Sequence, residues 1–405
     1  MERRNLRVVF IAHIATLGGG ADDLLLELVT ALSGDSAYTP LVVVPGDGEL
    51  AARLRRAGVL VTEAEYGWWC SRRPSERGRT PTLAAKQAAR CLERTWSSAS
   101  SIATALGDFS PDLIVSNTCV VSAGALAAAR MRLPHVWMAQ EYGREDFGFD
   151  FFLGYGPSMR LLGASSARVV SISHALGDAL QKYVKPGKIE VLHIPCLTPS
   201  GSALAAMDAS SPLRLILLGR GVPGKGTDDA IRAVGIARRR GVDVELRLVG
   251  GTSESDLQRL RALAVSEGVA ECVSVVSRLP DPIVEIDRAH VGLTCSRQEA
   301  FGRVTVEYLK RGRPVIGTRS GGTPELIEEG VTGLLYEPGN TEELANRIRL
   351  LASSRAMVWE MSEAALDHNA ERFLITEYAD GFRGALERAC RAGPAKNVWS
   401  LLPGA

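Results

Sequence analysis

Short apolar runs alternate with amphipathic helical segments along most of the chain. The runs are rich in β-branched residues and carry no polar alternation, which is typical of strands buried on both faces of a sheet. In the first half of the chain such runs lie at 6–12, 39–45, 112–117, 135–141 and 167–173. Strands that alternate with helices in this rhythm predict an α/β fold whose parallel sheets are covered on both faces.

A break in the pattern divides the chain into two parts of similar length. Residues 198–212 are mostly small, polar or proline residues without a core pattern, which is typical of a linker. A chain of 405 residues is also too long for one ordinary core. We therefore expect the following segments: a first domain over 1–197, the linker over 198–212, a second domain over 213–375, a helix over 376–392 and a tail over 393–405.

The composition is that of a soluble globular protein, and it argues against several kinds of partner, site and segment. Lys and Arg number 47 against 46 Asp and Glu, so the bulk charge gives no sign of a nucleic-acid partner. The seven cysteines form no CxxC pair, which argues against a zinc site or a disulfide framework and favours a reducing, cytoplasmic compartment. The apolar run near the N-terminus passes directly into a glycine turn and a helix, so we interpret it as a strand and not as a signal peptide. No run approaches the ~18 apolar residues that a membrane-spanning helix needs.

The segment 296–307, SRQEAFGRVTVE, is the strongest candidate site. The apolar run VGLTC precedes it and predicts a strand, Ser296 is a candidate helix cap, and helical spacing begins at Arg303. Glu299 then lies in a strand-to-helix loop and Glu307 about one turn inside the helix, on either side of Gly302. Carboxylates accept hydrogen bonds from diols, and the start of a helix attracts anions. A ligand with hydroxyls at both ends and a phosphate between them fits this arrangement, and a nucleotide-sugar is such a ligand.

A glycine-rich loop with two cations follows the apolar run at 213–219. Arg220 and Lys225 bracket this loop, and two cations there would balance a diphosphate and stabilise it as a leaving group, as a metal ion does elsewhere. The loop also matches the GxGxxG dinucleotide pattern. The next strand, however, ends in glycines and offers no acidic residue for a ribose, which argues against a dehydrogenase.

Seven residues lie between Glu299 and Glu307, and KRGRPVIGTRSGGTPELIEEGVTGLLYEPGNTEELANRI follows at 310–348. This pattern resembles the family 4 glycosyltransferases, retaining enzymes with two Rossmann-like domains that face each other across a cleft, the GT-B fold. The similarity is strong over residues 213–350 and weaker over the first half of the chain. The resemblance implies a metal-independent, retaining transfer of a sugar from a nucleoside diphosphate sugar to an acceptor hydroxyl, without a cofactor.

The resemblance also implies roles for individual residues. Glu299 would hold the transferred sugar and Glu307 the ribose, while the two cations would contact the diphosphate. The other donor contacts that it implies are a base loop with Arg278 and Leu279, the segment Ala300, Phe301, Gly302 and Arg303, and a glycine turn with Gly19 and Gly20. The glycines of that turn are equally compatible with a plain tight turn. The helix over 376–392 would cross back onto the first domain.

The group nearest the anomeric carbon of the donor stays open. Relatives place a histidine–aspartate or arginine–glutamate pair near the loop after 135–139, and here Glu141 occupies the most comparable position, without a histidine. The candidate catalytic groups are therefore Glu141 in the first domain and Arg220, Lys225 and Glu299 in the second. The small polar residues at 116–118 also end a strand, and we interpret them as helix caps.

Residues 66–79, YGWWCSRRPSERGR, combine two tryptophans with four arginines in a stretch without regular pattern. Such a stretch does not suit a packed core and favours contact with an acceptor or a peripheral contact with a membrane. The alternative is a mobile surface loop in which Trp68 or Trp69 packs back onto the body of the protein. The acceptor is expected to be a carbohydrate, a lipid-linked molecule or a small molecule. The alternative to an enzyme is a catalytically silent protein that binds a nucleotide-sugar as the partner of another transferase.

Overall fold

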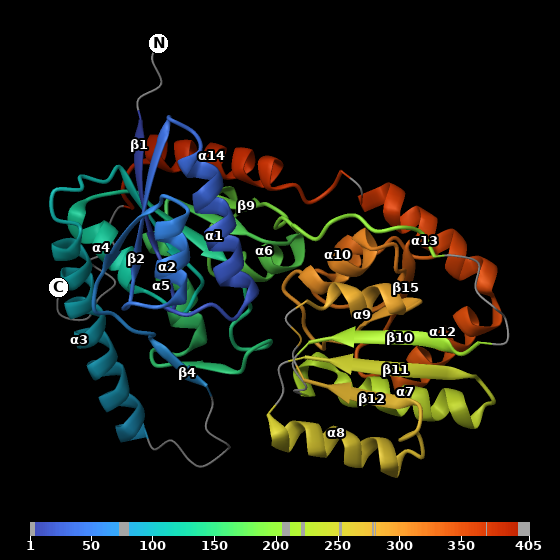
Figure 1. The fold of residues 1–405 in the computed structure, drawn as a ribbon. Coiled ribbons are helices and arrows are strands. Elements are labelled where there is room, and N and C mark those ends of the chain that lie inside the picture. The colour runs from blue at the N-terminus through green and yellow to red at the C-terminus, as the bar shows by residue number, and fades with distance from the viewer. Residues whose placement is uncertain are drawn as a thin grey trace. The chain divides into compact units, whose positions relative to one another are not determined.

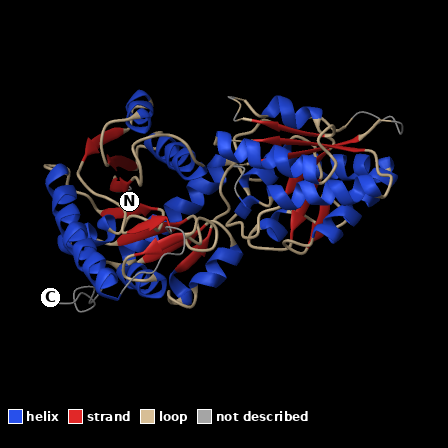
Figure 2. Ribbon diagram, turned by 90° about the horizontal axis from the view of Figure 1, so that it is seen from below, coloured by secondary structure: helices blue, strands red, loops and turns tan. Residues whose placement is uncertain are grey.

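The computed structural model divides into two compact units, one formed by Met1–Pro195 with Ile375–Ala405 and the other by Cys196–Leu374 (Figure 1). In each unit, helices cover both faces of a central parallel sheet (Figure 2). The residues that the structure describes are 5–72, 81–204, 211–219, 223–250, 253–277, 279, 281–369 and 371–395.

The first unit contains a seven-stranded parallel sheet with the strand order β3-β2-β1-β5-β6-β8-β9. The strands are β1 (Leu6–Ile11), β2 (Tyr38–Val44), β3 (Leu60–Glu63), β5 (Leu113–Asn117), β6 (His135–Ala139), β8 (Arg168–Ser171) and β9 (Ile189–Val191). A separate antiparallel ribbon pairs β4 (Cys70–Arg72) with β7 (Phe149–Phe151). The order of the large sheet reverses between β1 and β5, which gives the sheet a topological switch point there.

The helices of the first unit come from both ends of the chain. They are α1 (Gly20–Ser33), α2 (Glu49–Arg56), α3 (Pro81–Ala105), α4 (Ala123–Met131), α5 (Tyr155–Ser165), α6 (His174–Leu180), the 3-10 turn η1 (Pro186–Lys188) and α14 (Ile375–Ala392). Helix α14 packs beside α1, and its Phe382 is fully buried against Phe10 of β1, with ring centroids 6.2 Å apart. The C-terminal helix therefore completes the core of the unit that the N-terminus begins.

The second unit has a six-stranded parallel sheet with the order β12-β11-β10-β13-β14-β15. Its strands are β10 (Leu213–Leu218), β11 (Val244–Val249), β12 (Val273–Val276), β13 (Val291–Thr294), β14 (Val315–Thr318) and β15 (Gly333–Tyr336). Its helical elements are η2 (Pro223–Lys225), α7 (Thr227–Arg239), α8 (Glu254–Ser266), α9 (Ile283–Arg288), α10 (Arg303–Lys310), α11 (Thr323–Leu326), α12 (Thr341–Ser353) and α13 (Arg355–Asn369). The order reverses between β10 and β13, so this sheet also has a switch point.

Helix α10 is fixed on the second sheet by one buried aromatic side chain. Tyr308 is fully buried, and its hydroxyl accepts a hydrogen bond of 2.6 Å from the backbone N–H of Leu218. The ring lies directly over β13, where a Cβ on Gly292 would come within 2.3 Å of it. Glycine in the strand therefore allows the helix to lie close to the sheet, which sets the position of the neighbouring Glu307.

Two expectations about local packing are wrong. Trp69 is only 2% exposed and donates a 2.7 Å hydrogen bond from its indole to the carbonyl of Cys119. This part of the 66–79 segment does belong to a core, and the indole packs onto the body as the alternative interpretation had it. Leu204, expected in an unpatterned linker, is buried in the main core of the second unit, and its N–H donates to the hydroxyl of Ser362. Residues 73–80 and 205–210 lie outside the described residues.

Throughout the described ranges, every helix is too short or too polar to cross a bilayer.

His135 gives the first unit a pH-dependent stability. It is 1% exposed at the start of β6, and its two ring nitrogens lie 2.9 Å from the hydroxyls of Ser116 and Ser166. Burial lowers the pKa of His135 from 6.5 to about 3. Between these values the unfolded chain binds a proton that the folded chain does not, so stability falls as the pH falls from 6.5 towards 3.

We expect His135→Gln to reduce the slope of unfolding free energy against pH by about one proton between pH 6 and 4. Urea unfolding of the wild type and the variant at several pH values measures this slope. The exposed His368→Gln is the matched control for losing a histidine elsewhere in the chain. An unchanged slope in His135→Gln would contradict the assignment.

Candidate functional site

The candidate site of the second unit lies at the carboxyl ends of β10 and β13, the two strands at its switch point. Ligands of open α/β sheets bind where the strand order reverses, beyond the carboxyl ends of the strands. The loop after β10 leads through η2 to α7, and the loop after β13 leads to α10. The described parts of both predicted site loops therefore occupy the place where such a sheet binds its ligand.

A glycine brings these two loops into backbone contact. Gly226 is the N-cap of α7 with φ of +67°, and a Cβ there would lie 2.0 Å from the carbonyl oxygen of Cys295. The N–H of Arg297 donates a 3.1 Å hydrogen bond to the carbonyl of Gly224. Because no side chain could be accommodated at Gly226, the adjacent Lys225 is held against the loop that carries Glu299.

Lys225 and Glu299 form an ion pair. The Lys225 Nζ lies 2.8 Å from the Glu299 Oε2, and the side chains are 32% and 18% exposed. The Ser296 hydroxyl donates a 2.6 Å hydrogen bond to the same Oε2. Ser296 therefore orients Glu299 and is not the helix cap that we expected, because α10 begins one residue after Gly302, its N-cap, whose φ is +102°.

A third loop, between β14 and α11, supports the backbone of Glu299. The N–H of Gly322 donates a 2.8 Å hydrogen bond to the Glu299 carbonyl, and a Cβ on Gly321 would lie 2.0 Å from that oxygen. The glycine pair at 321–322 thus has a structural role, because it fixes the loop from which the Glu299 carboxylate projects.

The other predicted contacts in the second unit have different surroundings. Glu307 is 20% exposed, and its Oε1 lies 3.8 Å from the Nε of Arg303. Phe301 is 2% exposed and packs edge-on against Phe373, so it offers backbone but not side chain to a ligand. Ala300 is also buried.

The predicted base loop is described only in part. Leu279 packs against the hydrophobic core of the unit, whereas Arg278 lies outside the described residues. The same is true of Arg220, so the prediction of a second cation at the diphosphate stays a prediction.

In the first unit, the glycine turn is not required by the packing of the protein itself. Gly19 is the extended N-cap of α1, with φ of −157°, and Gly20 is the first helical residue. A Cβ on Gly18 would meet nothing within 4 Å, and one on Gly19 would meet only a carboxylate oxygen at 3.9 Å. Neither crowding nor a left-handed backbone explains Gly18 and Gly19, which leaves room for a ligand to approach the backbone closely.

Glu141 follows β6 and is 7% exposed. Its Oε1 accepts a 2.7 Å hydrogen bond from the N–H of Cys119. Burial raises the pKa of Glu141 from 4.5 to about 7, against the lowering effect of its hydrogen bonds with Cys119. A carboxyl with this pKa can hold or release a proton near neutrality.

Sequence reasoning missed a polar cluster at the switch point of the first sheet. The Nδ1 of His13, after β1, lies 3.4 Å from the Oδ1 of Asp22 and 3.5 Å from the Nδ2 of Asn117, which also contacts Gln140. Burial lowers the pKa of His13 to about 4 and raises that of Asp22 to about 7. Part of the signal was available, because His13, Asn117 and Gln140 lie at or just after the carboxyl ends of β1, β5 and β6, which are neighbours in the sheet.

The helix-capping interpretation of residues 116–118 is wrong. Asn117 donates to the carbonyl of Ala21, and Ser116 contacts His135. The N-cap of α4 is Ser122, whose side chain makes no capping hydrogen bond.

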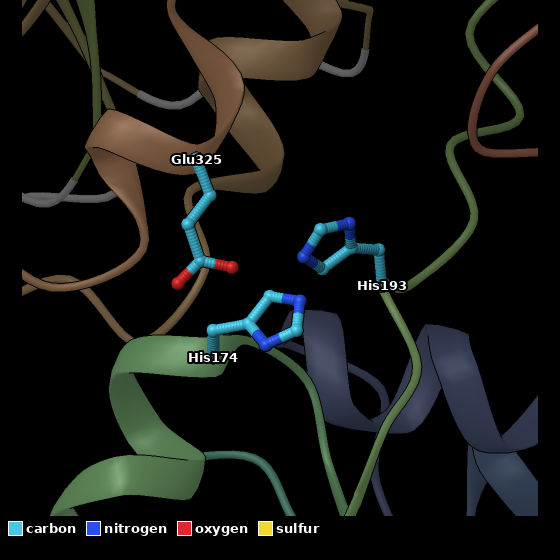
Figure 3. A group of neighbouring side chains, drawn as sticks. All are labelled: His174, His193 and Glu325. Carbon is cyan, nitrogen blue, oxygen red and sulfur yellow. The ribbon is translucent and has the colours of Figure 1, made fainter.

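Two other histidines of the first unit contact each other. His174 begins α6 and His193 follows β9, and their rings meet edge-on with centroids 5.7 Å apart (Figure 3). The third side chain in the figure, Glu325, belongs to α11 of the second unit.

Comparison with protein families identifies both halves of the chain. Residues 209–368 match the model described as "Glycosyl transferases group 1", and residues 19–195 match "Glycosyl transferase 4-like domain". The two matches cover most of the chain and leave out α14.

Comparison with individual proteins gives consistent results. The chain is 28% identical over 322 residues to D-inositol 3-phosphate glycosyltransferase of Acidothermus cellulolyticus, covering 67% of this chain and 71% of that protein. It is 30% identical over 247 residues to the Rhodococcus opacus protein of the same name, covering 56% and 55%.

Solved structures share the fold at lower sequence identity. Anabaena HepE in complex with UDP superposes with a TM-score of 0.72 at 21% identity, covering 94% of this chain and 100% of that one. Sucrose-phosphate synthase from Thermosynechococcus elongatus gives 0.72 at 17%, covering 96% and 99%. The predicted fold class, two Rossmann-like α/β domains, is confirmed.

The contact between Gly226 and Cys295 can be tested by adding one methyl group. Gly226→Ala introduces a strained positive φ, which costs ~1–2 kcal/mol, and an overlap with the Cys295 carbonyl, which costs a further ~1–3 kcal/mol. Gly241→Ala is the matched control, because Gly241 has φ of +78° but open space at its Cβ position. Urea unfolding should show a larger loss of stability for Gly226→Ala, and equal losses would argue against the close approach.

Proposed function

The chain belongs to the family 4 glycosyltransferases, and we propose that it transfers a sugar from a nucleoside diphosphate sugar to an acceptor hydroxyl with retention of the anomeric configuration. The observation that carries the proposal is the Lys225–Glu299 ion pair at the switch point of the second sheet. An ammonium group and a carboxylate at one ligand site match the two ends of the bond that breaks, an anionic diphosphate and a sugar with hydroxyls.

When the donor binds, it takes the place of each ion-pair partner: Lys225 and Glu299 separate and each contacts the donor instead. Lys225 moves from the carboxylate to the diphosphate, and with Arg220 it neutralises the charge that develops on the leaving group. Glu299, still held by the Ser296 hydroxyl, accepts hydrogen bonds from the sugar, while Glu307 accepts from the ribose. The backbone of Ala300, Phe301, Gly302 and Arg303 at the start of α10 faces the phosphates. The base lies beside Leu279 and Arg278.

The first unit supplies Gly19 and Gly20 for the phosphates and Glu141 near the reacting carbon. The open space around the glycine turn supports the first assignment. The raised pKa of Glu141 supports the second, because a carboxyl that titrates near pH 7 can accept the proton of an acceptor hydroxyl.

The reaction that we propose needs no metal ion, because two cationic side chains take its place at the diphosphate. The donor to test first is UDP-glucose, since one solved structure of similar fold is a complex of Anabaena HepE with UDP-glucose. The acceptor to test first is inositol 3-phosphate, after the names of the relatives. Among the cysteines whose side chains the structure describes, six are free thiols. We propose a reducing, cytoplasmic compartment for the protein.

Donor binding is expected to depend on Glu307. Saturating UDP-glucose, at about 100 times its Kd, should stabilise the wild type by ~2.7 kcal/mol in thermal unfolding. Glu307→Gln removes a charged acceptor of ribose hydrogen bonds, worth ~1.5–3 kcal/mol, and should weaken donor binding about tenfold or more. Glu387→Gln on α14 is the control, because Glu387 also pairs with an arginine four residues away. A donor Kd equal in both variants would argue against the ribose assignment.

Catalysis is expected to depend on Lys225. Lys225→Gln should lower the rate of UDP-glucose turnover about 100-fold, because the departing diphosphate loses a fixed cation. Lys182→Gln, an exposed lysine of the first unit, controls for loss of charge. Turnover in chelator-treated wild type tests metal independence in the same assay. Donor binding without any hydrolysis or transfer would favour the silent partner over the enzyme.

A further inference from the structure

The first unit contains a cavity of about 210 Å³ that is not part of the proposed donor site. It lies between α3 and the segment before β4, and its lining includes Trp68, Arg90, Arg94, Thr95 and Ser98. The cavity is smaller than the ~300 Å³ at which drug-sized ligand sites begin, so it has room for a single ring or head group.

Two guanidinium groups line the cavity without a carboxylate partner in the described part of the chain. Arg90 and Arg94 are four residues apart on α3 and therefore share one face of the helix. Other exposed arginines of this unit do pair with acids, as Arg53 does with Glu49 and Arg388 with Glu190. The Arg94 guanidinium lies beside the backbone of Gly67, where a Cβ would be in ordinary van der Waals contact with its Nη2 at 3.5 Å.

The cavity is also lined by an indole that is held in a fixed position. Trp68 is 36% exposed, and its Nε1 donates a 2.7 Å hydrogen bond to the carbonyl of His13. Its ring also lies against the His13 imidazole and edge-on to Phe149. An exposed aromatic face that cannot turn away is a platform for the apolar face of a sugar or cyclitol ring. The bond to His13 also connects the cavity to the carboxyl end of β1.

The polar groups of the cavity complete a recognisable chemistry. A pair of guanidinium groups binds phosphate or carboxylate through parallel charged hydrogen bonds. The Ser98 hydroxyl donates to the Arg94 carbonyl, which leaves its oxygen able to accept from a ligand hydroxyl. A ligand that carries an anionic group, a ring and hydroxyls would match these side chains, and a phosphorylated polyol is such a ligand.

We propose that this cavity binds a phosphorylated polyol as the acceptor of the transferred sugar, either as a free molecule or as the head group of a lipid. The inference rests on the proposed function and gives it an acceptor class. Arg90 and Arg94 hold the phosphate, and Trp68 stacks on the ring. Arg90 and Arg94 belong to α3, whereas the sequence pattern had predicted acceptor contacts only for residues 66–79.

Calorimetric titration of the full chain with myo-inositol 3-phosphate and with myo-inositol tests the site. The phosphorylated polyol should bind at least tenfold more tightly than myo-inositol, and Arg90→Gln with Arg94→Gln should remove at least that factor. Arg53→Gln with Arg56→Gln removes the same charge from α2 and should leave the affinity unchanged. Trp68→Leu should weaken both polyols. Absence of binding by both probes, or equal affinity in the two double variants, would overturn the proposal.

Vesicles of phosphatidylcholine with and without phosphatidylinositol distinguish the two sources of the ligand. Binding of phosphatidylinositol vesicles that depends on Arg90 and Arg94 assigns a lipid head group, and binding of the free phosphorylated polyol alone assigns a soluble acceptor. Equal binding of phosphatidylserine vesicles, whose anionic head group carries no polyol, would overturn the polyol assignment in favour of a general anionic surface.

The melting shift with UDP-glucose separates this inference from the proposed function. If the double variant of Arg90 and Arg94 keeps the nucleotide shift and the wild type binds no polyol, the cavity assignment alone fails. If UDP-glucose gives no shift in the wild type, the donor proposal fails. The polyol titration then tests independently whether the cavity binds a phosphorylated polyol.

Discussion

The second unit depends on close backbone packing around one loop, Cys295 to Gly302. Gly226 approaches this loop from one side and Gly321 from the other, each so closely that a Cβ would lie 2.0 Å from a carbonyl oxygen. Hydrogen bonds from Arg297 and Gly322 complete the arrangement. These backbone contacts, together with the buried side chain of Phe301, fix the loop, and the side chains of Ser296 and Glu299 are left for chemistry.

The ion pair that this packing positions is suited to exchange. Lys225 and Glu299 are both partly exposed, and pairs in contact with water contribute only ~0–1 kcal/mol to stability. Separating them to admit an anion and a hydroxyl is therefore inexpensive, while their positions remain set by the backbone. The low stability of the pair and the rigidity of its supports together give a site that is preorganised and still able to bind.

Much of the fold could be predicted from periodicity, because strands buried on both faces carry long apolar runs that little else imitates. Spacing alone also placed Glu299 and Glu307 on either side of a helix start. Partners distant in sequence could not be predicted in this way. Trp69 looks exposed beside four arginines but donates to Cys119, and Leu204 lies in a polar stretch but fills a core 158 residues from its partner Ser362. Asn117 was interpreted as a helix cap because a single sequence shows only the local preference of asparagine for such positions. Its contact with the carbonyl of Ala21 depends on the fold. The roles of Glu141 and Lys225 in catalysis stay predictions.

The fate of α14 bears on how the polypeptide is made. The ribosome completes every strand of the first sheet by Val191, yet the helix that covers Phe10 begins only at Ile375. While the intervening unit is synthesised, the apolar surface of the sheet that α14 covers in the finished protein has no helix to pack against it. The core of the N-terminal unit is therefore completed only after the whole second unit has been synthesised.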